Sequence, residues 1–157
     1  MAKTIRNVYD DAVSFDKLLK AHIKARRGKR EKRDVILFEL RLEQELLQLE
    51  EKLKNGTYRH GKYREFKVYE PKERMIKASG YRDRVIHQWY VENFIKPYFV
   101  PQFIHTSYAG IQGRGMHKAS KDVQNGMRSA KSKWSNYYIL KMDVTKYFQN
   151  IDKKILW

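Results

Sequence analysis

Asp143 is the residue whose type and position most favour chemistry in this sequence. It lies near the end of residues 137–144, Tyr-Tyr-Ile-Leu-Lys-Met-Asp-Val, a pattern typical of a β-strand. Side chains alternate between the faces of a strand, so Asp143 would share one face with Ile139 and Lys141 while the other face packs in a core. Burying an unpaired carboxylate is costly, so its presence there indicates a nearby cation or ligand.

A second candidate is the pair of cations that follows Pro71, namely Lys72 and Arg74. Residues 58–76 alternate aromatic or β-branched side chains with charged ones, which predicts short antiparallel strands. Residues two apart on a strand face the same way, so both cations could converge on one polyphosphate. The alternative is that two basic residues in a hairpin are solvated surface charges.

A third candidate is the glycine-rich segment before a predicted helix, where Arg114 stands between Gly113 and Gly115. Glycine lets the backbone approach a phosphate or sugar closely, and a helix start offers free amide donors. Arg114 is the candidate phosphate contact. The alternative is a plain loop that leads into the helix.

The chain is strongly basic, with 34 Lys and Arg against 18 acidic residues and a formal net charge of +16. Its densest point is residues 24–33, where seven of ten residues are basic. This pattern favours a nucleic-acid partner, with a solvated charge run as the alternative. The candidate phosphate contacts in this run are Arg26, Arg27, Lys29 and Arg30.

Composition narrows the class of protein. The 157 residues suit one compact unit, and without cysteine there is no disulfide, thiolate metal site or cysteine nucleophile. The five histidines show no close ligand spacing, which disfavours structural zinc. No segment approaches the roughly 20 apolar residues of a spanning helix or resembles a signal peptide, so we expect a soluble, cytoplasmic protein with no membrane partner.

Helices and strands must position these candidates. Apolar periodicity predicts helices over residues 10–23, 34–55, 83–96 and 116–130. Asp34 is expected to cap the second helix and Asn55-Gly56 to end it, while Pro97 is expected to stop the third. Asp83 is expected to be a cap or an ion-pair partner of a neighbouring arginine.

Three clusters, in this order, resemble reverse transcriptases. They are Tyr69-Glu70-Pro71-Lys72-Glu73-Arg74 with Arg82-Asp83-Arg84-Val85, then Thr106 to His117, then Asp143-Val144-Thr145-Lys146-Tyr147-Phe148 with Ile151-Asp152. The spacing looks most like the enzymes of diversity-generating retroelements, followed by retron and group II intron enzymes. The resemblance implies an α+β fold, with right-hand polymerase fingers and the first part of the palm. Residues 1–34 would be a basic N-terminal extension, 35–136 the fingers and 137–157 the start of the palm.

The resemblance also implies roles for residues in RNA-directed DNA synthesis. Asp143 would be catalytic and, with the Val144 carbonyl, would bind two Mg²⁺ ions about 4 Å apart. The incoming dNTP would be held by Lys72, Arg74, Val144 and Phe148. The Phe148 ring would lie under the sugar and reject a 2′-hydroxyl, with ordinary core packing as the alternative. Template and other nucleic-acid contacts would come from Arg82, Arg84, Gln112, Arg114 and the basic run, and Asp152 is expected to be a cap or a structural ion-pair partner.

Two departures from the family pattern limit what the chain should do alone. The hairpin is shorter than in intron enzymes, and the Tyr-x-Asp-Asp motif that supplies further metal ligands is absent. We therefore expect a chain truncated after Trp157 that does not polymerise by itself. An RNA template, a DNA or RNA primer and an accessory protein are partners implied by resemblance. The alternatives are a non-catalytic RNA-binding fingers module and a basic protein of ribosomal type, which would explain the charge but not the three clusters.

Overall fold

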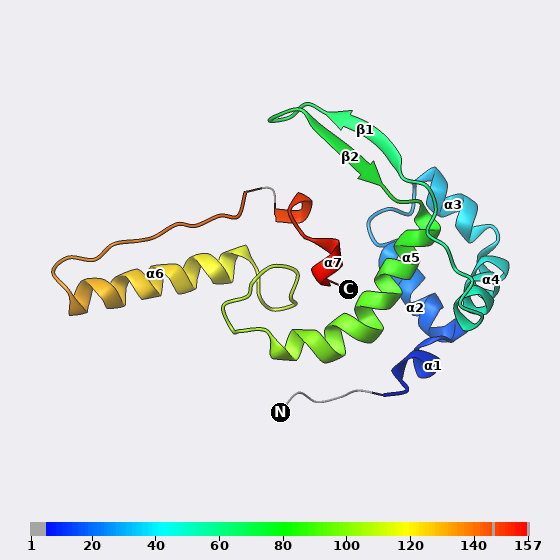
Figure 1. The fold of residues 1–157 in the computed structure, drawn as a ribbon, viewed down its shortest axis with the longest axis horizontal. Coiled ribbons are helices and arrows are strands. Elements are labelled where there is room, and N and C mark those ends of the chain that lie inside the picture. Colours follow the sequence, from blue (N-terminus) through cyan, green and yellow to red (C-terminus); the bar gives the residue numbers. More distant parts are fainter. Residues whose placement is uncertain (1–5, 146, 157) are drawn as a thin grey trace. The chain divides into compact units, whose positions relative to one another are not determined.

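The computed structural model describes residues 6–145 and 147–156, which form mixed α+β structure (Figure 1). Two compact units are present, Met1–Phe103 and Ile104–Trp157. The first contains α1 (Val8–Ala12), α2 (Phe15–Ala25), α3 (Arg33–Glu39), α4 (Leu42–Lys54), β1 (Arg64–Val68), β2 (Arg74–Ala78), α5 (Tyr81–Tyr90), η1 (Val91–Phe99) and η2 (Val100–Gln102). The second contains α6 (Met116–Lys133), η3 (Tyr147–Gln149) and α7 (Lys153–Leu156). The predicted α+β class is thus confirmed.

The core of the first unit forms where α5 packs against α2 and α3, with α4 closing over α2 (Figure 1). Leu18, Leu46 and Val85, from three of these helices, are fully buried. Trp89 donates a 2.7 Å hydrogen bond from Nε1 to the Ala12 carbonyl, which ties α1 to the same core. The described part of the predicted N-terminal extension therefore packs together with the segment that follows it.

Two predicted helices are each divided in the structure. The helix expected over residues 10–23 is broken at Ser14, whose side chain accepts a hydrogen bond from Lys17 N and caps α2. The helix expected over 34–55 is broken between α3 and α4. Asp34 is not its cap, because Lys32 occupies that position. The end of α4 at Asn55 is confirmed, followed by Gly56 at φ +64°.

The break between α3 and α4 has a packing reason. Val35 and Phe38 of α3 and Leu46 and Leu49 of α4 all enter one core. A single straight helix drifts its apolar stripe around the axis, whereas two short helices can each turn that stripe toward α5 and α2. The apolar stripe was therefore predicted correctly, and only its division into two helices was missed.

Strands β1 and β2 pair antiparallel, which confirms the hairpin. The register places Phe66 opposite Ile76 and Val68 opposite Arg74. Lys72 lies in the turn and only Arg74 lies on a strand. The argument that strand alternation points both cations the same way is therefore wrong for Lys72.

The helix predicted to stop at Pro97 does not stop there. α5 continues directly into the π-helix η1, which contains Pro97. Proline lacks an N–H and its ring clashes with a preceding carbonyl in an α-helical turn. The wider turn of a π-helix relieves that crowding, so the chain passes through the proline without a break.

The second unit confirms the helix predicted over residues 116–130, which is α6. The strand predicted over 137–144 is wrong, since this segment runs without secondary structure (Figure 1). Tyr138 is 94% exposed and Leu140 79%. A strand needs a neighbour for its backbone groups, and none of the described residues pairs with this segment.

No helix in the described part of the chain is both long enough and apolar enough to cross a membrane.

Candidate functional site

The β1–β2 hairpin presents the two cations predicted to bind a nucleotide. Lys72 and Arg74 are both exposed, and neither has a carboxylate partner among the residues that the structure describes. Glu73, between them, pairs instead with Lys67 at 2.6 Å. The hairpin therefore leaves both cationic groups available to an anion.

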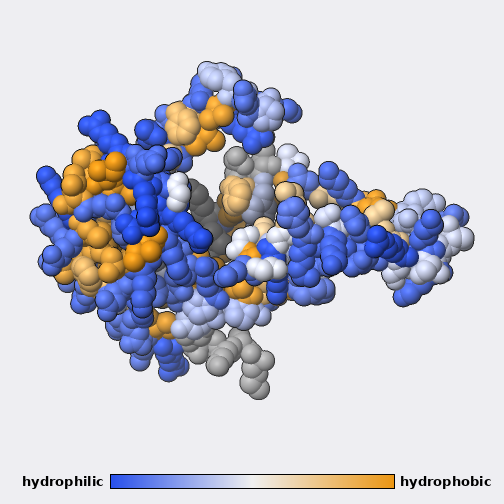
Figure 2. Space-filling model, turned by 180° about the vertical axis from the view of Figure 1, so that it is seen from behind, coloured by the Kyte–Doolittle hydropathy of each residue, from blue (hydrophilic) through white to orange (hydrophobic). Residues whose placement is uncertain are grey.

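The two faces of this hairpin differ in character. Cross-strand partners share a face, so Phe66, Val68 and Ile76 lie on the face that also carries Arg64 and Arg74. The opposite face carries the ion pair between Lys77 and Glu65, at 2.8 Å. Each of the three apolar side chains is at least 36% exposed. Figure 2 shows hydrophobic residues of the hairpin at the surface, surrounded by hydrophilic ones.

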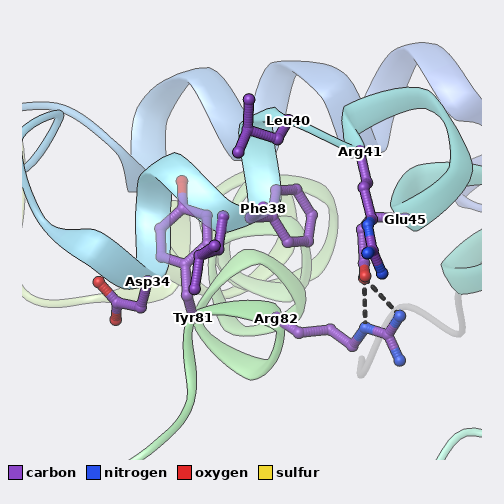
Figure 3. Close-up of a pocket in the computed structure, with 8 residues that line it drawn as sticks. Asp34, Phe38, Leu40, Arg41, Glu45, Tyr81 and Arg82 are labelled. Carbon is purple, nitrogen blue, oxygen red and sulfur yellow. Dashed lines mark hydrogen bonds and ion pairs between the residues drawn. The ribbon is translucent and has the colours of Figure 1, made fainter.

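Arg82 and Arg84, predicted to contact nucleic acid, are held by carboxylates of the first unit. Arg82 donates from Nε to Glu45 Oε2 at 2.7 Å and from Nη2 to the same oxygen (Figure 3). Its Nη2 also donates to Gln48 Oε1 at 3.0 Å. Arg84 donates to Asp34 Oδ2 at 2.5 Å. These pairs fasten the start of α5 to α4 and α3, so both guanidinium groups have a structural role.

A pocket opens beside the Arg82–Glu45 pair, between the end of α3, the start of α4 and the start of α5 (Figure 3). Phe38 and Tyr81 supply aromatic walls, and their rings meet edge to face at 5.2 Å. The exposed Leu40 lies at the rim. Four charged residues line the pocket: Arg82 and Glu45 are paired with each other and Asp34 with Arg84, whereas Arg41 has no ion-pair partner among the residues that the structure describes.

Asp83 is buried and is neither a cap nor the partner of a neighbouring arginine, contrary to prediction. Its Oδ1 accepts hydrogen bonds from the Tyr58 hydroxyl at 2.5 Å and from Gly61 N at 3.2 Å. His60 Nε2 lies 3.8 Å from its Oδ2. Burial, followed by the hydrogen bond to Asp83, raises the pKa of Tyr58, which therefore stays protonated and donating. The carboxylate is thus a structural acceptor that holds the chain before β1.

The basic run forms the loop between α2 and α3. Arg26 donates from Nη1 to Glu39 Oε1 at 2.6 Å, and this hydrogen bond is the main cause that lowers the pKa of Glu39. Arg27, Lys29 and Arg30 are exposed, with no carboxylate partner in the described part of the chain. Three of the four predicted phosphate contacts are thus unpaired, while Arg26 anchors the loop.

In the second unit, Arg114 folds back onto its own loop. Its Nη1 donates to the Ile104 carbonyl at 2.9 Å and approaches the Ser107 carbonyl at 3.5 Å. Gly113, just before it, has φ +75°, a conformation that favours glycine. Gln112 is exposed. Arg114 therefore shapes the turn, and the predicted phosphate contact would have to compete with these carbonyls.

The third cluster is exposed at its described residues except Ile151, which is half-buried, and Lys146 lies outside the described residues. Asp143, Val144 and Tyr147 border a shallow hollow with Lys141 and Met142. Phe148 is 83% exposed, so the alternative of core packing is wrong. Asp152 Oδ1 accepts from Lys154 N at 2.8 Å, which confirms its expected role as a cap at the start of α7.

No group of three or more His, Cys, Asp or Glu side chains converges in the described part of the chain. A centre with two Mg²⁺ ions needs several hard oxygen ligands. Asp143, with the Val144 carbonyl, supplies only part of such a set. The described residues therefore do not by themselves fit a two-metal centre.

A scan against protein-family models and a search of curated proteins found no match to this chain. The likeness to reverse transcriptases consequently rests on the residues alone.

Proposed function

We propose that this chain is the fingers and early palm portion of an RNA-directed DNA polymerase, and that it contacts the template, the primer and the incoming dNTP. The observation that carries the proposal is that Lys72 and Arg74 on the hairpin are exposed and have no carboxylate partner within residues 6–145 and 147–156. Two such cations suit a triphosphate, whose oxygens accept several charge-assisted hydrogen bonds at once. The order of the three sequence clusters and the net charge of +16 support the same function.

In this proposal each cation has a simple task. Arg74, at the start of β2, offers a forked donor to phosphate oxygens, and Lys72, in the turn, offers a compact charge on a flexible stem. Together they would hold the polyphosphate and offset its negative charge as the bond to the leaving pyrophosphate breaks. Phe148 would lie under the sugar, a role for which its ring is accessible.

The proposal requires two Mg²⁺ ions in the intact protein, with Asp143 and the Val144 carbonyl among their ligands. Further carboxylates would have to come from outside the described residues, because those residues do not form the complete set. Cytoplasmic location, which is expected from the sequence, and an accessory protein, which the resemblance implies, are further parts of the proposal.

Primer extension tests the proposal. The protein containing this chain should extend a DNA primer on an RNA template with Mg²⁺ and dNTPs. Asp143→Asn should abolish extension and leave RNA affinity within about twofold, because one carboxylate adds little to binding a polyanion. Asp152→Asn is the matched control, since Asp152 caps α7, and it should retain extension. Undiminished extension by Asp143→Asn would refute the polymerase assignment.

The hairpin cations have a separate kinetic signature. Lys72→Ala and Arg74→Ala should each raise the KM for dNTP by roughly tenfold, the loss of one charge-assisted hydrogen bond. Lys52→Ala removes an exposed charge from α4 and should leave that KM unchanged.

A second candidate function is a non-catalytic module that binds RNA. It is favoured by the exposed Arg27, Lys29 and Arg30 together with the incomplete carboxylate set. Such a module would bind RNA with a steep salt dependence and would show neither primer extension nor dNTP binding. Affinity confined to ribosomal RNA would instead favour a protein of ribosomal type.

A further inference from the structure

A groove in the first unit runs between the start of α3 and the β1–β2 hairpin. Its lining includes Lys32 and Arg33 at the start of α3, Arg84 of α5, and Arg64 and Phe66 of β1. The hairpin and α3 lie near one another in Figure 1 as well. Lys32 and Arg33 belong to the predicted basic run and Arg84 was a candidate contact, but the sequence did not predict that they share a groove with Arg64 and Phe66, because these residues come from separate segments.

The groove carries four cationic side chains and one carboxylate, that of Asp34. Asp34 is already paired with Arg84. Lys32, Arg33 and Arg64 have no ion-pair partner in the described part of the chain. Three uncompensated positive charges in one groove give it a potential that attracts a polyanion and repels a cationic partner.

An aromatic ring stands among these charges. Phe66 is 41% exposed, and the Arg64 guanidinium carbon lies 5.6 Å from the centre of its ring. A ring flanked by a guanidinium is a platform on which an unpaired base can stack, while the cations contact the phosphates. Bases in a duplex are already stacked on each other, so a duplex would leave Phe66 unused.

We infer that this groove binds single-stranded nucleic acid. Lys32, Arg33 and Arg64 contact its phosphates, one base stacks on Phe66, and the Arg84–Asp34 pair shapes the wall without contributing net charge. The inference rests on the proposed function, because both assign a nucleic acid as the partner. The groove is nevertheless distinct from Lys72 and Arg74, which do not line it.

Fluorescence anisotropy of a labelled single-stranded RNA about 12 nucleotides long, without self-complementarity, tests the charged wall. The double variant Arg33→Ala/Arg64→Ala should bind at least about tenfold more weakly than the wild type, since two phosphate contacts are lost. The slope of log affinity against log salt should become shallower by about 1.4, at about 0.7 for each phosphate on a single strand.

Lys20→Ala/Lys52→Ala is the matched control, because it removes the same charge from exposed positions on α2 and α4. Its affinity should stay within about twofold of the wild type, since neither lysine lines the groove. Equal losses in the two double variants would show that only bulk charge matters and would overturn the inference.

The stacking platform is tested by changing the ring alone. Phe66→Leu should weaken binding by about fivefold or more with an unchanged salt slope, because no charge is lost. Phe66→Tyr keeps a flat ring and should bind as the wild type does. Full affinity in Phe66→Leu, or a duplex of the same sequence bound as tightly as the single strand, would overturn the inference.

Three further measurements keep the outcomes separate. Urea denaturation of each variant shows whether the hairpin variants still fold. If Phe66→Leu does not fold, Phe66→Tyr is the conservative substitution that still reports on the ring. A DNA strand of the same sequence shows which of the two nucleic acids the groove prefers, and binding of neither would refute the site. Primer extension that survives in groove variants with unaltered RNA affinity would reject the groove and leave the polymerase proposal standing.

Discussion

The Tyr58 hydroxyl donates a 2.5 Å hydrogen bond to Oδ1 of the buried Asp83. This bond joins the segment that follows α4 to the first turn of α5, where a negative charge also interacts favourably with the helix dipole. Gly61 N donates to the same oxygen, and a Cβ at Gly61 would lie 3.0 Å from Oδ2. The carboxylate thus fixes the path of the chain into the hairpin.

Loss of the Tyr58 hydroxyl should therefore destabilise the first unit. Tyr58→Phe leaves the buried Asp83 carboxylate with one donor fewer, which should lower the free energy of unfolding by about 1–3 kcal/mol. Urea denaturation measures this change. Tyr63→Phe is the control, since the Tyr63 side chain is 52% exposed, and it should alter stability by less than about 0.5 kcal/mol. Equal stability of the two variants would show that the bond contributes nothing.

The buried His22 should make stability depend on pH. Its Nδ1 lies 3.1 Å from the Tyr81 hydroxyl, and its Nε2 lies 3.3 Å from Glu39 Oε1, the oxygen that Arg26 also contacts. Burial is the main cause that lowers the pKa of His22. Below the ordinary value of about 6.5 the unfolded chain binds a proton more readily than the folded chain, so acid favours unfolding.

We therefore expect the free energy of unfolding to fall as pH decreases from about 7 to about 5, by at most about 1.4 kcal/mol per pH unit for one proton. Denaturant titrations at several pH values measure the slope. His22→Gln should flatten it in this window, whereas the exposed His117→Gln should keep it. The lowered pKa of Glu39 acts in the same direction but only below the ordinary pKa of a glutamate, because its stabilisation is lost as pH falls through its folded pKa.

Two glycines should respond to alanine in opposite ways. Gly56 follows α4 at φ +64°, so Gly56→Ala should lower the free energy of unfolding by about 1–2 kcal/mol through backbone strain alone. Gly126 lies inside α6 with open space around it, so Gly126→Ala should raise the stability of that helix by up to about 1 kcal/mol. Urea titration reports the first change, and far-ultraviolet circular dichroism during heating reports the second. A stabilised Gly56→Ala would contradict the helix end described above.

Arg82 should matter more for stability than for RNA affinity. Arg82→Gln breaks the forked contact with Glu45 and should lower the free energy of unfolding by about 1 kcal/mol, since the pair is partly exposed. A double-mutant cycle with Glu45→Gln should show coupling between the two residues. RNA affinity should stay within about twofold. A severalfold loss of affinity with a salt slope shallower by about 0.7 would instead show that Arg82 contacts a phosphate.

Local features were predictable from the sequence. The apolar stripe that includes Phe38 and Leu49 marked the core face of α3 and α4, and Gly56 marked the end of α4. The alternation of Phe66 and Val68 with charged residues marked the hairpin. Helix periodicity and turn preferences depend on neighbours within a few positions, so the sequence alone carries them.

The candidate site was only partly predictable, because most of its arginines were assigned from their type and their place in a motif. Glu45, which binds Arg82, is 37 residues away, and Asp34, which binds Arg84, is 50 residues away. No local sequence pattern predicts which carboxylate will pair with a given guanidinium group. The groove with Lys32 and Phe66 was missed for the same reason, since its walls are joined only by folding.

The sequence by itself determined the net charge, the apolar stripes of the helices, the hairpin, and the chemical types of the candidate residues. Tertiary structure decided which cations have no carboxylate partner among the described residues, as is the case for Lys72, and which form an ion pair, as Arg82 does. It also left residues 137–144 without a strand partner, although their alternation is that of a strand. Backbone preference acts over a few residues, whereas ion pairs and strand ladders join groups that only the folded chain brings within reach.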